Sequence, residues 1–155
     1  MKHIISLLLL LVGYVVAEGN SSGTHNISFA TTEGTWMSVD MSPNGKTIAF
    51  DLLGHIYLLP ISGGKARAIT NGTSWNMFPR FSPDGNTILF TSDRSGSDDL
   101  WTQDLSSGEM KNISGMKFPV HQGTWSNDSR HVFGTALNMK VRHPVYMFNM
   151  YGEKQ

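Results

Sequence analysis

A repeat with a period of about 40 residues constrains this chain more than any other feature. Residues 41–50 read MSPNGKTIAF, and residues 81–90 read FSPDGNTILF. A fixed period in this range is typical of folds that stack similar supersecondary units. Each unit of such a fold buries its apolar surface only against its neighbours. The chain is therefore expected to form part of an array.

Each of these two copies carries the signals of four short strands. The Ser-Pro-Asn/Asp-Gly segment suits a tight turn, because proline presets φ and glycine accepts a positive φ. The run after the turn is rich in β-branched and aromatic residues. Four antiparallel strands in about 40 residues make one propeller blade, whereas a β-sandwich of similar hairpins is the alternative. The strands are expected at 38–42, 47–52, 55–61 and up to Thr70, then at 80–82, 87–92, 99–105 and up to Ser114.

A third copy of the repeat is eroded. Residues 125–133 keep the serine and the aspartate of the turn but lack its proline and glycine, and Val145–Met150 is expected to be a further strand. We therefore predict an all-β fold, a partial β-propeller of about three four-stranded antiparallel blades over residues 35–155. The blades are expected at about 35–72, 73–114 and 115–155. A closed propeller has four to eight blades.

The N-terminus is typical of an export signal. A basic start precedes the apolar run Ile4–Val12, and Val15–Ala17 offers small residues before a cut, so residues 1–17 are predicted to be a signal peptide. The run is shorter than the about 20 residues that cross a bilayer, although an uncleaved anchor remains the alternative. Residues 18–34 are expected to be a leader in which Ile27–Ala30 is a candidate ring-closing strand. The expected location is secreted or periplasmic, without membrane contact after cleavage.

Composition narrows the classes of function further. The chain has 12 Lys and Arg residues against 12 Asp and Glu residues and no block of like charge, so nucleic acid is not an expected partner. Cysteine is absent, which excludes disulfides, thiolate catalysis and thiolate metal sites. In a eukaryotic host, Asn-x-Ser/Thr sequons would predict N-glycosylation. The candidate acceptors are Asn20, Asn26, Asn71, Asn112 and Asn127.

The second copy carries a family resemblance. Phe81–Gly85, Ile88–Arg94 and Asp99–Trp101 resemble the repeat of TolB-type propellers, which is similar to the repeat of prolyl-oligopeptidase relatives. The resemblance implies that the three blades belong to a TolB-like ring of six or seven blades. It specifies the fold and leaves the function open, because one fold hosts many functions.

A narrower resemblance lies in the first copy. Glu33–Asp40, Phe50–Gly54 and Leu59–Gly64 resemble the first blade of exported amidohydrolase-related proteins, in which a propeller precedes a metal-dependent hydrolase barrel. This implies a non-catalytic module that supports or gates a downstream hydrolase domain. A divalent metal such as zinc would belong to that domain, and no cofactor is expected in this chain. Whether the parent protein is an enzyme stays open. The alternative is a standalone scaffold for protein–protein interaction; a fragment without independent function overlaps both.

No catalytic or metal-ligating residue is predicted in the chain. Gly19–Gly23 matches the sequence pattern of a nucleophile elbow. That motif needs a strand before it and a helix after it, whereas this segment lies in the expected polar leader. The histidines lack His-x-His or His-Glu-x-x-His spacing, and His121, His131 and His143 are expected on loops or blade surfaces. The acidic run 93–99, which includes Arg94, is interpreted as turn capping with an ion pair rather than as a cation site.

Aromatic side chains offer the one candidate contact surface. Trp75 and Phe78 stand near the start of a blade, facing the expected central channel, where a protein partner would contact the propeller face. The other aromatic residues recur at equivalent blade positions, which favours packing between blades over a ligand platform. These are Trp36, Phe81, Phe90, Trp101, Trp125 and Phe133.

Overall fold

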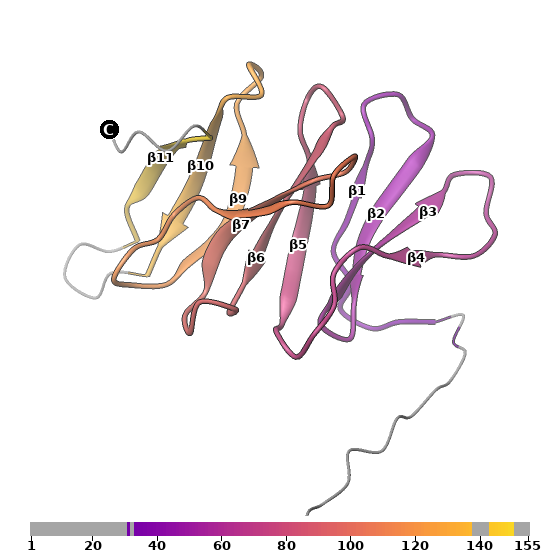
Figure 1. The fold of residues 1–155 in the computed structure, drawn as a ribbon, viewed down its shortest axis with the longest axis horizontal. Coiled ribbons are helices and arrows are strands. Elements are labelled where there is room, and N and C mark those ends of the chain that lie inside the picture. Colours follow the sequence, from indigo (N-terminus) through magenta and orange to yellow (C-terminus); the bar gives the residue numbers. More distant parts are fainter. Residues whose placement is uncertain (1–30, 32, 138–142, 151–155) are drawn as a thin grey trace, which may run out of the picture. The chain divides into compact units, whose positions relative to one another are not determined.

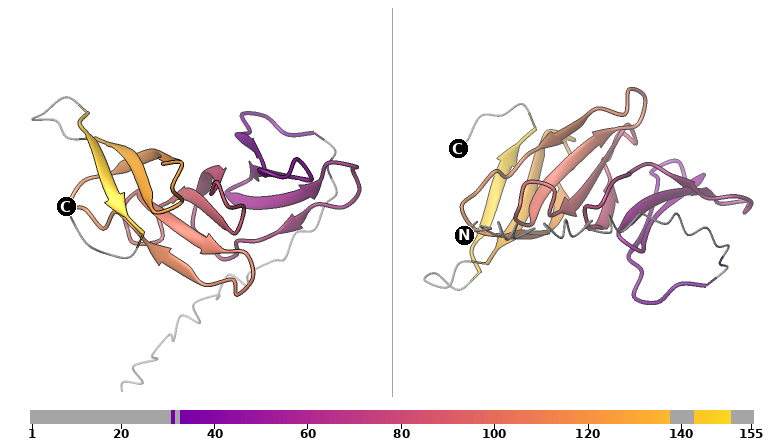
Figure 2. Two further views of the ribbon diagram at one scale, coloured as in Figure 1. Left: turned by 90° about the horizontal axis from the view of Figure 1, so that it is seen from above. Right: turned by 60° about the horizontal axis from the view of Figure 1, so that its bottom comes forward.

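The computed structural model describes residue 31 and residues 33–137 and 143–150. The described residues from 33 onward belong to one compact unit. Its secondary structure consists of strands in three antiparallel sheets that follow one another in chain order (Figures 1 and 2). The expected all-β partial propeller is thereby confirmed. The strands are β1 (Val39–Met41), β2 (Thr47–Leu52), β3 (His55–Pro60), β4 (Arg67–Ala68), β5 (Asn76–Phe81), β6 (Thr87–Ser92), β7 (Asp99–Asp104), β8 (Met110–Asn112), β9 (Val120–Trp125), β10 (His131–Ala136) and β11 (Val145–Asn149).

Each sheet is a simple meander. The first two sheets have the orders β1-β2-β3-β4 and β5-β6-β7-β8, and the third pairs β11-β10-β9 among the described residues. Strand β5 begins at Asn76, earlier than the expected Arg80. The extension depends on a break in register between Met77 and Arg80, where Pro79 needs no ladder hydrogen bond.

The Ser-Pro-Asn/Asp-Gly segments form matching turns. Gly45 and Gly85 have φ values of 68° and 76°, and their amides donate to the carbonyls of Ser42 and Ser82 at 2.8 Å. In the second copy, the Ser82 hydroxyl donates to Asp84 Oδ1 at 2.5 Å. This hydrogen bond and one from the Asn86 amide hold the pKa of Asp84 below its usual range.

The eroded third turn keeps the same shape with different residues. Ser129 takes the glycine position with a φ of 56°, and its amide donates to the Ser126 carbonyl at 3.2 Å. The Arg130 amide and the His131 side chain donate to Asp128, and these bonds hold the pKa of Asp128 well below its usual range. The third turn thus keeps the side-chain-centred hydrogen bonds of the other two turns without the Pro-Gly pair.

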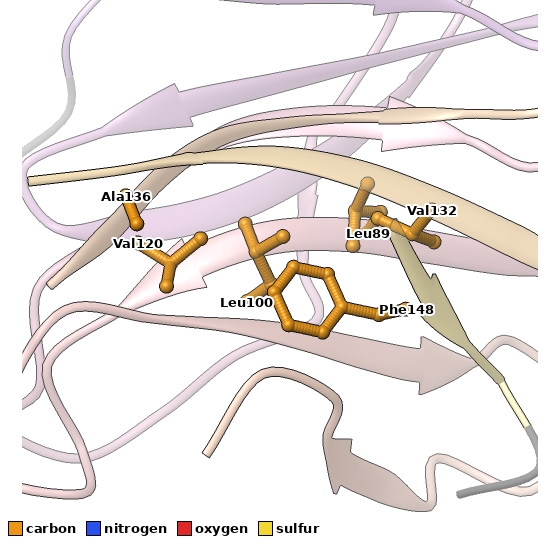
Figure 3. Packing of buried hydrophobic residues seen from close by; sticks show 6 residues of the cluster. All are labelled: Leu89, Leu100, Val120, Val132, Ala136 and Phe148. Carbon is orange, nitrogen blue, oxygen red and sulfur yellow. The ribbon is translucent and has the colours of Figure 1, made fainter. Parts of the chain in front are cut away.

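Two apolar clusters join the three sheets. The cluster between the first and second sheets has Ala49 and Ile56 on one side and Phe81, Ile88 and Phe90 on the other. The cluster between the second and third sheets is shown in Figure 3. Its buried members are Leu89, Leu100, Val120, Val132, Ala136 and Phe148.

Glycine lets the third sheet approach the second closely. A Cβ added at Gly134 would lie 2.6 Å from Leu100 Cδ1 and 2.9 Å from Val120 Cγ1. A Cβ at Gly123 would lie 2.8 Å from Leu89 Cδ2. These distances are shorter than van der Waals contact, so a side chain at either position would force the neighbouring leucine or valine side chains to move.

Most of the aromatic side chains pack between blades as expected. Phe81, Phe90, Trp101 and Trp125 belong to the two clusters or pack against them. Two residues are exceptions. The side chain of Trp36 is 100% exposed, and the half-buried Phe133 belongs to neither cluster. No helix long and apolar enough to cross a membrane is found in the described part of the chain. The predicted signal peptide, leader and ring-closing strand at 27–30 lie outside the described residues.

Candidate functional site

The first strands of the three sheets converge and form a groove. Strands β1, β5 and β9 each stand at one edge of their sheet, and β5 contacts both β1 and β9. The groove has a volume of about 490 Å³. Ser38, Phe78, Arg80, Gln122, Gly123 and Thr124 line it. We call this site the inner groove.

Two residues of the inner groove have a left-handed backbone. Phe78 has a φ of 58° and Gln122 a φ of 50°, both inside strands and both four residues before the turn serine. The ladders shift register at the same places in β5 and β9. A bulge of this kind redirects side chains and ends regular pairing, and strained backbone conformations of this kind cluster at functional sites.

Asp51 holds the backbone of two groove residues, Ser38 and Phe78, in place. Its Oδ1 accepts the Ser38 amide at 2.9 Å, and its Oδ2 accepts the Phe78 amide at 2.8 Å. Asp51 is buried in β2, so one carboxylate ties two neighbouring blades through amides that lack ladder partners. Sequence reasoning missed this residue; its one signal is a carboxylate in an otherwise apolar strand.

Arg80 supplies the positive charge of the inner groove. Its Nη1 donates to the Pro79 carbonyl at 2.8 Å and to the Val39 carbonyl at 3.4 Å. The Arg80 carbonyl accepts Trp125 Nε1–H at 3.1 Å, which ties β5 to β9. The half-buried guanidinium keeps donors for an oxygen ligand, because guanidinium has five N–H groups.

The two predicted contact residues lie in different surroundings. Phe78 lines the inner groove. Trp75 is 55% exposed, donates its amide to Asp93 Oδ1 at 2.8 Å and has its ring against Gly54. Ligand contact stays a prediction for both residues, and Trp75 is not among the residues that line the groove.

The predicted glycosylation sites also differ in their surroundings. Asn71 and Asn127 are exposed, whereas Asn20 and Asn26 lie outside the described residues. Asn112 is half-buried; its Nδ2 donates to Asp99 Oδ2 at 3.0 Å, and its Oδ1 accepts the Gly115 amide. A glycan at Asn112 would have to fit around these bonds, so Asn71 and Asn127 are the better candidates for the prediction.

Asp99 is the centre of a capping network in the acidic segment. Its carboxylate accepts from the hydroxyls of Ser95 at 2.5 Å and Ser114 at 2.7 Å and from the Asn112 amide. Burial opposes ionisation, but these three hydrogen bonds outweigh it and hold the pKa of Asp99 below its usual range. The carboxylate therefore holds β8 to the start of β7, in agreement with the capping interpretation.

Arg94 is half-buried and has a similar structural role. Its guanidinium lies over the rings of Phe90 and Trp101, with centroid distances of 5.5 and 5.1 Å, and donates to Asn76 Oδ1 at 2.7 Å. Burial lowers the pKa of Arg94, and the charge of Asp93 opposes this shift. These contacts join Arg94 to three strands of the second sheet, which argues for a role in packing.

The candidate histidines are not brought together as ligands. His121 Nδ1 lies 3.4 Å from Asp98 Oδ2, and His131 Nδ1 lies 2.7 Å from Asp128 Oδ2. Among the described residues, no group of three His, Asp or Glu side chains is close enough to hold a metal ion.

Four-stranded antiparallel sheets with converging first strands define a β-propeller. A family model described as the TolB beta propeller domain matches residues 16–153. Because this match covers most of the chain, the chain belongs to the TolB β-propeller family.

Two curated relatives contain a similar segment. The Tol-Pal system protein TolB of Bordetella pertussis is 40% identical over 58 residues, covering 37% of this chain and 13% of that protein. Dipeptidyl-peptidase 5 of Porphyromonas gingivalis is 26% identical over 118 residues, covering 72% of this chain and 16% of that protein. The chain thus spans a small part of the length of the curated relatives it matches.

Solved structures show the same fold. A TolB-type protein of Agrobacterium tumefaciens aligns with a TM-score of 0.70 and 22% identity, covering 79% of this chain and 49% of that chain. TolB of Acinetobacter baumannii aligns with a TM-score of 0.61 and 26% identity, covering 73% of this chain and 29% of that chain.

Proposed function

We propose that the chain is a non-catalytic binding module that holds an acidic or carboxylate-bearing segment of a protein partner in the inner groove. The observation that supports this most is the convergence of three blades on one groove that Arg80 and Phe78 both line. Ser38, Gln122 and Thr124 line the same groove and add polar groups.

The chemistry of the inner groove matches such a ligand. A guanidinium binds carboxylates through parallel N–H···O hydrogen bonds, which are stronger than neutral ones. An aromatic residue in the same groove adds apolar contact area, and the hydroxyl and amide groups can bond the peptide backbone. The bulges at Phe78 and Gln122 interrupt regular pairing in β5 and β9, which exposes this edge of the sheets.

Fluorescence polarisation with labelled decapeptides of net negative, neutral and positive charge tests this proposal. We expect the acidic peptides to bind the purified chain and Arg80→Ala to weaken that binding about tenfold, which corresponds to about 1.4 kcal/mol. Arg67→Ala is the matched control, because Arg67 is exposed on β4 and does not line the groove.

Two outcomes of the binding assay would contradict the proposal. If Arg80→Ala and Arg67→Ala bind the acidic peptides alike, or if all three peptide charges bind alike, the inner groove is not the binding site. Circular dichroism of both variants separates a lost contact from a lost fold.

We further propose that the parent protein is amidohydrolase-related, and that the propeller supports or gates a downstream metal-dependent hydrolase domain. The supporting observation is the resemblance of Glu33–Asp40, Phe50–Gly54 and Leu59–Gly64 to the first blade of that family. The match to a small part of dipeptidyl-peptidase 5 is compatible with a module inside a larger enzyme. A divalent metal such as zinc would then be a cofactor of the other domain.

The coding sequence downstream of Gln155 distinguishes this proposal from a standalone scaffold. Further blades followed by a His-x-His strand support the hydrolase, because two such histidines are typical metal ligands. A stop codon after a complete ring contradicts it.

The proposed location is extracytoplasmic, supported by the signal-like residues 1–17. N-terminal sequencing of the exported protein checks the cut after Ala17.

A further inference from the structure

The chain contains two Asn-Gly pairs, and the structure places them in different surroundings. Asn44-Gly45 lies in the turn between β1 and β2, and Asn71-Gly72 lies in the connection from β4 to β5. Asparagine before glycine is prone to deamidation, because glycine has no side chain that hinders its backbone nitrogen from reaching the asparagine side chain. The local structure then decides which of the two pairs reacts.

Asn71 and Gly72 lie in an exposed loop. Residues 71–73 are all exposed, and Gly72 has a φ of 88°. Within the described part of the chain, neither the Asn71 side chain nor the Gly72 amide has a hydrogen-bond partner. A Cβ added at Gly72 would meet no atom within 4 Å. The Gly72 nitrogen and the Asn71 side-chain carbon Cγ are therefore free to approach each other.

The strand after this loop is anchored independently of Asn71. The backbone amide and the Nδ2 of Asn76 both donate to the Gly54 carbonyl, at 3.0 and 2.7 Å. The Trp75 amide donates to Asp93 Oδ1 at 2.8 Å. The loop can therefore change its conformation while β5 stays in place, which allows a ring to form at Asn71 within the folded protein.

Asn44 is held by hydrogen bonds on both of its reacting sides. Its Oδ1 accepts the Ser42 hydroxyl at 2.9 Å and the Lys46 amide at 3.0 Å. The Gly45 nitrogen, which would have to attack, donates to the Ser42 carbonyl at 2.8 Å. These bonds must break before the reaction, and each of them adds to the barrier. The hydrogen bonds that shape the turn thus also protect its asparagine.

We propose that Asn71 is a site of spontaneous deamidation in the folded protein and that Asn44 is protected from it. The Gly72 nitrogen gives its proton to hydroxide and forms a bond to Asn71 Cγ. The bond from Cγ to Nδ2 then breaks, and ammonia leaves with a proton taken from water. Water opens the resulting cyclic imide at either carbonyl and leaves aspartate or isoaspartate at position 71. Solvent is the one co-reactant, and nothing is oxidised or reduced.

The reaction changes the charge of the loop and its capacity for other modifications. The acidic residues rise from 12 to 13 against 12 basic ones, so the formal net charge falls from 0 to −1. The Asn71-Gly72-Thr73 sequon is lost with the side-chain amide, so a glycan can be attached at Asn71 only before deamidation. The isoaspartate product also lengthens the main chain between the first and second sheets.

Peptide mapping by mass spectrometry, after incubation of the full chain in mildly alkaline buffer, tests the proposal. The tryptic peptide 68–80 contains Asn71 and the buried Asn76, so its fragment ions compare both asparagines directly. We expect Asn71 to deamidate at least about tenfold faster than Asn44, which corresponds to a difference in barrier of about 1.4 kcal/mol. Both rates should rise with pH, because the attacking nitrogen must first lose its proton.

Two comparisons separate the effect of the fold from that of the sequence. In guanidinium chloride no turn protects Asn44, so the two Asn-Gly pairs should react at similar rates. In ion-exchange chromatography of the incubated folded protein, Asn71→Gln should lose the main acidic species. Asn44→Asp is the matched control, because it gives the first turn the residue of the second; this variant should still form a more acidic species.

Three results would overturn the proposal. In the folded protein, Asn44 could react as fast as Asn71 or faster. The ratio of the two rates could be the same in the folded and the unfolded chain, which would mean that the sequence alone decides. Finally, Asn71 could stay intact in the folded protein under conditions in which it reacts in the unfolded chain.

Discussion

Ser129 is the residue that keeps the third turn in the shape of the other two. It has a φ of 56° at a position where the two earlier copies use glycine. A left-handed conformation costs a non-glycine residue about 1–2 kcal/mol. The cost is tolerated because Asp128 bonds the amides of Arg130 and His131 at 2.8 and 3.1 Å.

Ser129→Gly should therefore be more stable than Ser129→Ala by about 1 kcal/mol. Both variants lose the long hydrogen bond of 3.2 Å from the Asp84 amide to Ser129 Oγ, so their difference isolates the backbone. Urea unfolding of the two proteins measures it. Equal midpoints would mean that the turn changes conformation when the side chain changes.

Asp99→Asn should reduce the free energy of unfolding by about 1–3 kcal/mol at neutral pH, since three donors, of which Ser114 is buried, lose a charged acceptor. The folded-state pKa of Asp99 lies below its usual value, so its contribution is complete above about pH 4 and is lost as the pH falls through the folded pKa. Unfolding curves of both proteins from neutral to strongly acidic pH should converge. Glu109→Gln, at an exposed position, is the control and should show no such pH-dependent gap.

At the scale of strands, the sequence predicted what depends on local signals. Strands β2 and β6 occupy the expected residues 47–52 and 87–92, because alternating β-branched and aromatic residues follow a turn with defined chemistry. The inner groove was only partly predictable. Phe78 was a candidate, but Asp51 acts on amides 13 and 27 residues away, and no local pattern encodes such a contact.

Asp51→Asn should lower stability by about 1–3 kcal/mol, because the new NH₂ group would face one of two amide donors. It should also abolish peptide binding, since the bulge at Phe78 loses its anchor. Asp40→Asn is the matched control: one oxygen of Asp40 accepts the Phe81 amide at 2.8 Å, and asparagine keeps one oxygen. Thermal unfolding and the polarisation assay measure the two effects. Similar losses in both variants would contradict a special role for Asp51.

At the scale of the whole molecule, the second of the three described sheets has a described neighbour on each face. Amides of β6 and β7 should exchange most slowly, and those of β2, β3, β10 and β11 faster, because local opening follows burial. Hydrogen exchange read by mass spectrometry checks the order. Uniform protection of all three sheets would show that the unit opens as a whole.

Hydrogen-bond ladders run within each sheet, whereas the two apolar clusters join one sheet to the next. The unit is therefore strong along a blade and weaker between blades. When its two ends are pulled apart by an optical trap, the blades should detach singly. Each release should lengthen the tether by the contour of about 40 residues, roughly 130–140 Å at full extension. A partner that pulls on one end of the array would likewise detach the blades one at a time.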